Sequence, residues 1–314
     1  MNVLLTGGTG FIGSHIAVEL VNRGHNVTIL ARNQNKIPAL KKMRRIEIIE
    51  GEIENRNLLT TLAGGKDACI HVALILRDNS ARDMLLADTL VTVTLADICA
   101  AAGVKHFIYT SSCAANDFVY KTETARIGGA ALYNVYEHTR QNPASYYGAS
   151  KAASENYLNA VSFQTPMKVN IVRPGFTFGN PVVEGAPIYS DGRFAEMFRN
   201  IRQGKGVRVT KNDGTQFLWA GHLAEIYSSV LEKGVNRAMY FALSRDYVSW
   251  EEIAARAITL CNSSSKLIVE DKGWGEPIMF DVGAIKRDFD LEFDAWDKLP
   301  EHLEYYRDLP DPRN

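Results

Sequence analysis

Short apolar runs alternate with longer amphipathic stretches over the first part of the chain. The runs are rich in Val, Ile and Leu, which is typical of strands buried on both faces of a sheet. The stretches between them carry apolar residues at helical spacing, and several end at a glycine. The expected strands are 2–8, 26–32, 45–53, 67–73, 105–112 and 168–175, and the clearest helices are 14–24, 81–103 and 147–161. Strict alternation of strand and helix predicts an α/β fold, a doubly wound parallel sheet covered by helices on both faces.

The alternation ends at Gly175, and the pattern beyond it is different. Glycine, proline and aromatic residues become dense through 175–194. Helices are expected after this segment, with short strands between them, at 194–204, 220–234 and 249–261. We therefore expect two units. The larger is the sheet domain of 1–174 and 215–232, and the smaller is a C-terminal α/β substrate-binding lobe of 175–214 and 233–314.

Composition narrows the class of partner. The 314 residues carry a formal net charge of -1, which gives no indication of a nucleic-acid partner or an anionic membrane surface. No apolar run approaches the roughly 20 residues that span a bilayer, and the N-terminus begins a strand rather than a signal peptide. The four cysteines lack paired spacing and the seven histidines are dispersed. We expect a cytoplasmic protein with reduced cysteines, no metal site and a small-molecule substrate.

Four glycines follow the first strand in "TGGTGFIG". Gly8, Gly10 and Gly13 satisfy one dinucleotide fingerprint, G-x-G-x-x-G, while Gly7, Gly10 and Gly13 satisfy another, G-x-x-G-x-x-G. Such glycines allow a tight turn, let backbone amides approach a pyrophosphate, and let the helix pack closely on the strand. Since the loop lies between a strand and an amphipathic helix, it predicts a nucleotide cofactor. The alternative is a tight turn with only a structural role.

The end of the second strand bears on which dinucleotide is bound. NAD enzymes usually carry an acidic residue there for the ribose 2′-hydroxyl, whereas this chain has Ala31 and Arg32, with Lys36 a turn later. The planar fork of an arginine can pair with a 2′-phosphate. NADP is therefore preferred over NAD, although Arg32 as a solvated cation, or stacked on adenine, is compatible with NAD. Glu52 and Ile53, after the third strand, are placed to meet the adenine edge.

Tyr147 and Lys151 stand four residues apart in "YYGASK", on one face of a predicted helix. An unperturbed phenol has a pKa of about 10 and is a weak base at neutral pH. A neighbouring ammonium lowers the pKa of a phenol, so such a pair can exchange a proton with a substrate oxygen. Ser112 at the end of the fifth strand could orient the same oxygen. Tyr146 competes with Tyr147 for the role, but only Tyr147 has a lysine four residues on.

These motifs together resemble the extended short-chain dehydrogenase/reductase superfamily, in particular its NAD-dependent epimerase/dehydratase family. The resemblance runs from Met1 to about Ser249 through "TGGTGFIG", "HVA", "YTSS", "YGASK" and "RPGFTFG". It implies a Rossmann fold, a homodimer, and Ser112, Tyr147 and Lys151 as the catalytic trio, with Ser111 a rival for the serine role. The implied cofactor-lining residues are Gly7, Gly10, Phe11, Ile12, Gly13, Arg32, Lys36, Glu52, Ile53, Ala73, Thr110, Tyr147, Lys151, Pro174 and Gly175.

Two departures from the family pattern bear on the substrate. Nucleotide-sugar dehydratases show Thr-Asp-Glu where this chain has "SCA" at 112–114, so the acid and base that expel water are missing. Epimerases carry an arginine that clamps a diphosphate near a later "FVHVDD"-like segment, and here Thr215 and Gln216 stand at that place. A nucleotide-sugar substrate is therefore in doubt. The candidates to supply phosphate contacts instead are Arg193, Arg199, Arg202 and Arg208.

Three functions follow from this interpretation. The first is an NADP-preferring oxidoreductase that transfers hydride to or from a carbonyl or hydroxyl carbon. The second is a nucleotide-sugar epimerase, in which bound NAD takes hydride and returns it to the opposite face. The third is a regulator that binds dinucleotide without catalysis, against which the Tyr147 and Lys151 pair argues. The aromatic segment 116–138 is expected to form a substrate-side flap, or merely to cover the cleft.

Overall fold

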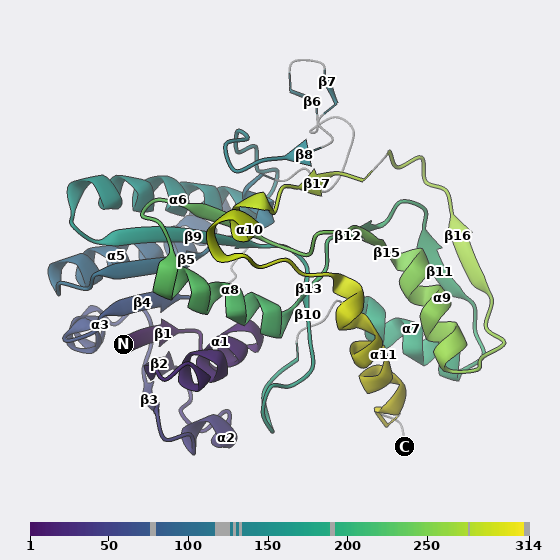
Figure 1. Ribbon diagram of the computed structural model, residues 1–314, viewed down its shortest axis with the longest axis horizontal. Helices are drawn as coiled ribbons and strands as arrows, with labels where there is room; N and C mark the ends of the chain where they lie inside the picture. Colours follow the sequence, from purple (N-terminus) through teal and green to yellow (C-terminus); the bar gives the residue numbers. More distant parts are fainter. Residues whose placement is uncertain are drawn as a thin grey trace.

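A seven-stranded parallel sheet forms the centre of the molecule (Figure 1). The computed structural model describes residues 1–75, 80–116, 126–127, 130–131, 134–188, 192–275 and 277–310. The strand order is β14-β9-β5-β4-β1-β2-β3, and every neighbouring pair is parallel. The strands are β1 (Asn2–Thr6), β2 (Asn26–Ala31), β3 (Ile46–Glu50), β4 (Ala68–His71), β5 (His106–Thr110), β9 (Lys168–Pro174) and β14 (Met239–Ala242).

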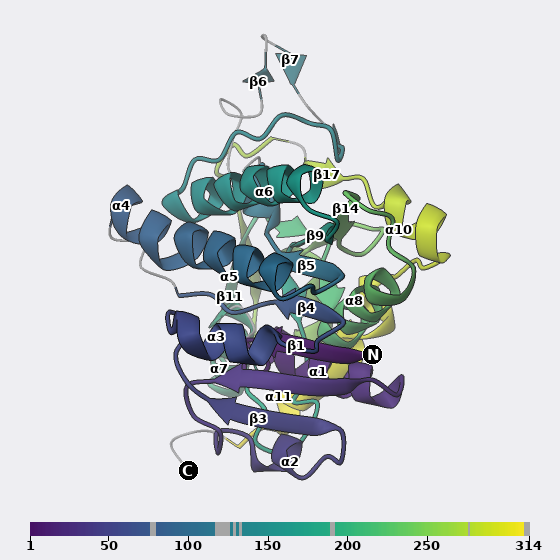
Figure 2. The same cartoon turned by 90° about the vertical axis from the view of Figure 1, so that its left-hand side faces the viewer.

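Helices cover both faces of this sheet, as Figure 2 shows. Successive strand residues point to opposite faces, so in β1 Val3 and Leu5 join one core cluster and Leu4 joins the other. The first cluster lies under α1 (Phe11–Asn22) and α8 (Ala220–Lys233). The second lies under α3 (Arg56–Ala63), α5 (Leu90–Ala101) and α6 (Tyr146–Gln164). The expected doubly wound α/β fold is confirmed.

A smaller lobe lies beside the carboxyl ends of the sheet strands (Figure 1). Its strands are short and pair segments that are far apart in the sequence. Its core is rich in aromatic rings, among them Phe194, Phe217 and Trp250. The elements are β10 (Thr177–Phe178), α7 (Gly192–Arg202), β11 (Val207–Thr210), β12 (Gly214–Thr215), β13 (Leu218–Trp219), β15 (Val248–Ser249), α9 (Trp250–Leu260), β16 (Leu267–Glu270), η3 (Ala295–Asp297) and α11 (Leu299–Asp308).

The remaining elements are short connections around these two units. They are α2 (Pro38–Lys41), α4 (Ala81–Met84), the π-helical turn η1 (Leu85–Thr89), η2 (Cys113–Ala115), β6 (Arg126–Ile127), β7 (Ala130–Ala131), β8 (Asn134–Val135), β17 (Met279–Phe280) and α10 (Gly283–Phe289). β6 pairs with β7, and β17 pairs with β8. Most of the expected flap at 116–138 lies outside the residues that the structure describes.

Two details differ from the sequence-based expectations. Residues 239–242 fall in the segment expected to belong to the smaller lobe, but they form β14, which pairs with β9 as the seventh strand of the sheet. The helix Ala81–Ala101 is 21 residues long and is apolar enough to cross a membrane by length and composition, although no such run was expected. Half of its most apolar window is buried inside the protein, where it covers the sheet.

Candidate functional site

The glycine-rich loop is held in a conformation that side chains would block. Gly7 has φ +74, and a Cβ on it would lie 2.6 Å from the backbone nitrogen of Ala73. A Cβ on Gly13 would lie 2.1 Å from the carbonyl oxygen of Gly7, because the first turn of α1 packs directly on the loop. Gly10 is the N-cap of α1 and offers no side-chain acceptor to the helix amides. The loop therefore presents free backbone donors at a helix N-terminus, the arrangement that binds phosphate.

A cavity of about 460 Å³ opens above this loop. It lies at the carboxyl ends of the sheet strands, where doubly wound folds bind dinucleotides. Of the residues expected to line the cofactor, the cavity is lined by Gly7, Gly10, Phe11, Ile12, Gly13, Arg32, Lys36 and Ala73. Its lining also includes residues that the sequence analysis missed, namely Thr9, Leu30, Ala31, Val72 and Leu74. Most of these adjoin a predicted residue, so widening the β1, β2 and β4 segments by one position would have found them.

The other expected cofactor residues, Tyr147 and Lys151 among them, lie outside this cavity lining. Glu52 is exposed, and Ile53 packs in the core cluster under α3 and α5. Thr110 accepts a hydrogen bond from the Tyr227 hydroxyl at 2.6 Å. Pro174 is buried at the end of β9, and Gly175 lines a different cavity, the one that Ser112 also lines. Their contact with a cofactor stays a prediction.

The predicted tyrosine and lysine face each other at the start of α6. The helix is capped by Ser145, whose hydroxyl accepts from the amide of Gly148 at 3.0 Å. A Cβ on Gly148 would lie 2.3 Å from the carbonyl oxygen of Ala114, so the first turn of α6 is pressed against the segment that follows β5. The Lys151 Nζ lies 5.7 Å from the centre of the Tyr147 ring. Tyr146 points away, with 49% of its surface exposed.

Lys151 is buried and its ammonium has two fixed acceptors. Its Nζ donates to Asp88 Oδ1 and to the carbonyl oxygen of Thr110, both at 3.2 Å. Desolvation alone would lower the pKa of Lys151, but the attraction of Tyr109, Asp88 and Tyr147 outweighs burial and raises that pKa above its usual value. Lys151 is therefore a permanent cation beside the phenol of Tyr147.

The two serines at the end of β5 have different surroundings. Ser111 is buried and donates to the carboxylate of Glu155. Ser112 lines a cavity of about 590 Å³, and its Oγ accepts from the amide of Ala114 at 3.1 Å. The geometry thus favours Ser112, the serine preferred from the sequence, as the one that can meet a substrate.

A buried ion pair beneath this cavity was not anticipated from the sequence. Arg173 forms a two-point contact with Glu155, and its remaining nitrogen donates to Asn116 Oδ1 at 2.6 Å. Gln141 also donates to Glu155, at 2.6 Å. A signal was available, because Glu155 follows Lys151 by one helical turn on the face of α6 that carries Tyr147.

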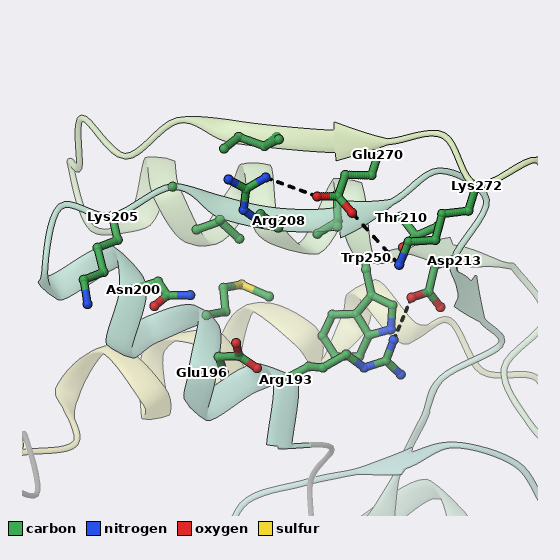
Figure 3. A pocket seen from close by; sticks show the side chains of 15 residues that line it. Arg193, Glu196, Asn200, Lys205, Arg208, Thr210, Asp213, Trp250, Glu270 and Lys272 are labelled. Carbon is green, nitrogen blue, oxygen red and sulfur yellow. Dashed lines mark hydrogen bonds and ion pairs between the residues drawn. The ribbon is translucent and has the colours of Figure 1, made fainter.

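A further cavity of about 520 Å³, the outer cavity, lies in the smaller lobe (Figure 3) and shares part of its lining with the cavity at Ser112, the inner cavity. Three residues line both: Arg193, Asp213 and Trp250. The Arg193 guanidinium lies 4.2 Å from the centre of the Trp250 ring and 2.8 Å from Asp213 Oδ2. The outer cavity carries further cations and amides, labelled in Figure 3 as Asn200, Lys205, Arg208 and Lys272.

The four arginines proposed for phosphate contacts separate into two groups. Arg193 and Arg208 line the outer cavity. Arg202 instead donates to the carbonyl oxygens of Tyr306 and Leu309, and Arg199 is exposed outside the lining. Within the described ranges no group of three or more His, Cys, Asp or Glu residues could hold a metal ion.

The model of the NAD-dependent epimerase/dehydratase family matches residues 3–241. A UDP-glucose 4-epimerase of Klebsiella pneumoniae is 38% identical over 124 residues, which are 36% of this chain and 89% of that protein. A decarboxylating sterol-4-alpha-carboxylate 3-dehydrogenase of Dictyostelium discoideum is 30% identical over 57% of this chain and 54% of its own length. The chain spans roughly half the length of several curated relatives that it matches.

Solved structures share the fold over almost the whole chain. The UDP-glucuronic acid 4-epimerase of Bacillus cereus, solved in complex with NAD, superposes with a TM-score of 0.79 at 18% identity. The match covers 98% of this chain and 99% of that one.

Proposed function

The chain belongs to the NAD-dependent epimerase/dehydratase family, and from that premise we propose that it is a nicotinamide-dependent oxidoreductase acting on a carbonyl or hydroxyl carbon. The single observation that carries the proposal is the meeting of Tyr147 and Lys151 at the start of α6, whose first turn is pressed against the segment after β5 that carries Ser112. The substrate is a small molecule with a C–O group that fits between the sheet and the smaller lobe.

The glycine loop fits a dinucleotide, because Gly7, Gly10 and Gly13 line the cavity of about 460 Å³ at the N-terminus of α1, where backbone amides can meet a phosphate. Gly7, Gly10 and Gly13 would hold the pyrophosphate on the N-terminus of α1, and Ala73 would lie along the cofactor. A bound nicotinamide supplies or accepts the hydride. Lys151 would hold the ribose next to it.

Proton transfer falls to the side chains of this chain. Tyr147 gives a proton to the carbonyl oxygen, or takes one from the hydroxyl, as general acid or base. The permanent charge of Lys151 stabilises the phenolate form of that tyrosine. Ser112 holds the reacting oxygen by a hydrogen bond.

NADP is the proposed dinucleotide, with NAD as the alternative. Arg32 and Lys36 line the cofactor cavity at the end of β2, where no carboxylate is present to hold a 2′-hydroxyl. Both side chains are exposed, and neither forms an ion pair in the part of the chain that is described. A 2′-phosphate would supply the missing counter-charge.

A second candidate is a nucleotide-sugar epimerase, favoured by two neighbouring cavities that share part of their lining. The inner cavity is lined by Ser112 of the proposed trio, and the outer one is lined by Lys205, Arg208 and Lys272 together with Glu196 and Glu270. Such a shape would take a long substrate with an anionic end, and several relatives are UDP-sugar epimerases. Turnover without net oxidation of cofactor would distinguish this function from reduction.

Replacing Tyr147 with Phe tests the proposal. We expect turnover to fall by about 10²- to 10⁴-fold, the usual contribution of a general acid or base, with dinucleotide affinity unchanged. The matched control is Tyr146→Phe, which removes the neighbouring exposed phenol and should leave turnover intact. The measurement is NADPH oxidation against panels of carbonyl compounds and nucleotide sugars. Full activity in Tyr147→Phe would refute the assigned role.

A further inference from the structure

Asp88 is a buried carboxylate in the middle of the largely apolar helix Ala81–Ala101. Only 2% of its surface is exposed. It lies in the π-helical turn η1 between α4 and α5, and such turns are frequent at functional sites. Burying a carboxylate is costly unless it is paired and hydrogen-bonded. The position therefore calls for an explanation beyond packing.

Both oxygens of this carboxylate are fixed, and both contact the catalytic helix. Oδ1 accepts from Lys151 Nζ at 3.2 Å, and Oδ2 accepts from the hydroxyl of Ser150 at 2.6 Å. The hydroxyl of the next residue, Thr89, donates to the carbonyl oxygen of Ser150 at 3.1 Å and lies 3.0 Å from the Ser150 hydroxyl. The π-helical turn η1 therefore forms hydrogen bonds with two consecutive residues of α6, Ser150 and Lys151, and Lys151 is the lysine that faces Tyr147.

We propose that Asp88 is a positioning residue for Lys151, which holds its ammonium in place and moderates the positive charge that reaches Tyr147. The catalytic part of this inference rests on the proposed function. Its physical part concerns only the ionisation of Tyr147 and does not require a known substrate. By opposing the charge of Lys151, the carboxylate sets the pH at which Tyr147 exchanges its proton.

Asp88 and Lys151 are the dominant charges in their surroundings. Lys151 faces Asp88 from α6, His71 from β4 and Tyr109 from β5, while Tyr147 of α6 and Tyr227 of α8 interact with Lys151. Burial, helped by Lys151, lowers the pKa of His71 to about 3, and burial raises the pKa of Tyr109 to about 12. Burial also raises the pKa of Tyr227. These three side chains are therefore neutral near physiological pH.

The test is a phenolate titration of Asp88→Asn. Absorbance near 295 nm is followed against pH, and the curve of the matching Tyr147→Phe protein is subtracted from each to isolate one phenol. Asparagine keeps the size and an acceptor oxygen, so only the charge is removed. We expect the midpoint to move to lower pH by roughly one unit, because Lys151 then acts on Tyr147 unopposed.

The matched control is the same Asp-to-Asn replacement at an exposed position. Asp97→Asn alters an exposed carboxylate on α5 and should leave the midpoint in place. If the midpoint of Asp88→Asn coincides with that of the parent protein, or lies at higher pH, the proposal is overturned. A shift without any turnover in the substrate panels would support this inference and count against the proposed function separately.

Should Asp88→Asn fail to fold, as judged by circular dichroism, Ser150→Ala carries the same test. Loss of the serine hydroxyl frees Oδ2 and leaves the carboxylate charge less stabilised beside Lys151. The phenolate is then harder to form, so the midpoint should move to higher pH. An unchanged midpoint in this folded variant would also refute the role of Asp88.

Discussion

The sheet domain and the smaller lobe hold their charges in different ways. Beneath the inner cavity, Arg173 and Glu155 form a buried pair whose side chains are 4% and 6% exposed. In the lobe, Arg208 and Glu270 pair at 3.1 Å but are 68% and 42% exposed. A buried charge must keep its partner, whereas water replaces a partner lost at the surface.

The difference bears on function. On the sheet side, Tyr147 and Lys151 stand on a scaffold of buried polar contacts that leaves few alternative geometries. On the lobe side, the cations of the outer cavity are held by exposed pairs or by stacking, as with Arg193 on Trp250. Under the proposed function, the buried side would carry the catalytic groups and the exposed side would recognise the substrate, because surface residues vary without harm to the core.

The largest effect is expected at the buried pair. Arg173→Met leaves the carboxylate of Glu155 buried without its counter-charge, and such a change costs about 3–5 kcal/mol of the free energy of unfolding. The measurement is urea unfolding followed by circular dichroism. The comparison partner is Arg208→Met, which breaks the exposed pair and should cost no more than about 1 kcal/mol. Equal losses in the two variants would remove the distinction between the two regions.

The same contrast explains what could be predicted from the sequence. Six strands of the sheet and helix α6 were found because hydrophobic periodicity is local and each element carries its own signal. The individual strands of the lobe could not be located from the sequence. β12 and β15, for example, have two residues each and pair across more than 30 positions of the chain. Strands that short have no periodicity to detect.

The residues of the candidate site also fall into those that could be predicted from the sequence and those that could not. The glycine loop and the Tyr147–Lys151 spacing were recognisable because each is one short segment. Asp88 and Arg173 were not singled out, because a charged residue on a helix or strand is usually solvated. Their partners are distant in the chain, with 63 positions between Asp88 and Lys151. Only the packing of η1 on α6 brings that pair together.

A second prediction concerns the glycine-rich loop of the sheet domain, between β1 and α1. Gly13→Ala places a methyl group 2.1 Å from the carbonyl oxygen of Gly7, so the helix must move away from the loop. Overpacking of this kind costs about 1–3 kcal/mol, and dinucleotide affinity should fall with it. Thermal unfolding and calorimetric titration measure the two effects. Gly192→Ala, at the start of α7 in open space, is the control and should change neither.

The smallest effect on the stability of the fold is expected where the sheet domain resembles the lobe, at the exposed cations after β2. Arg32→Ala should weaken NADPH binding by about tenfold or more, since a hydrogen bond to a charged group contributes about 1.5–3 kcal/mol. NADH lacks the 2′-phosphate and should lose far less. Arg44→Ala removes an exposed arginine outside the cavity and corrects for general changes of charge. Equal losses for the two dinucleotides in Arg32→Ala would show that the exposed cations after β2 do not select NADP over NAD.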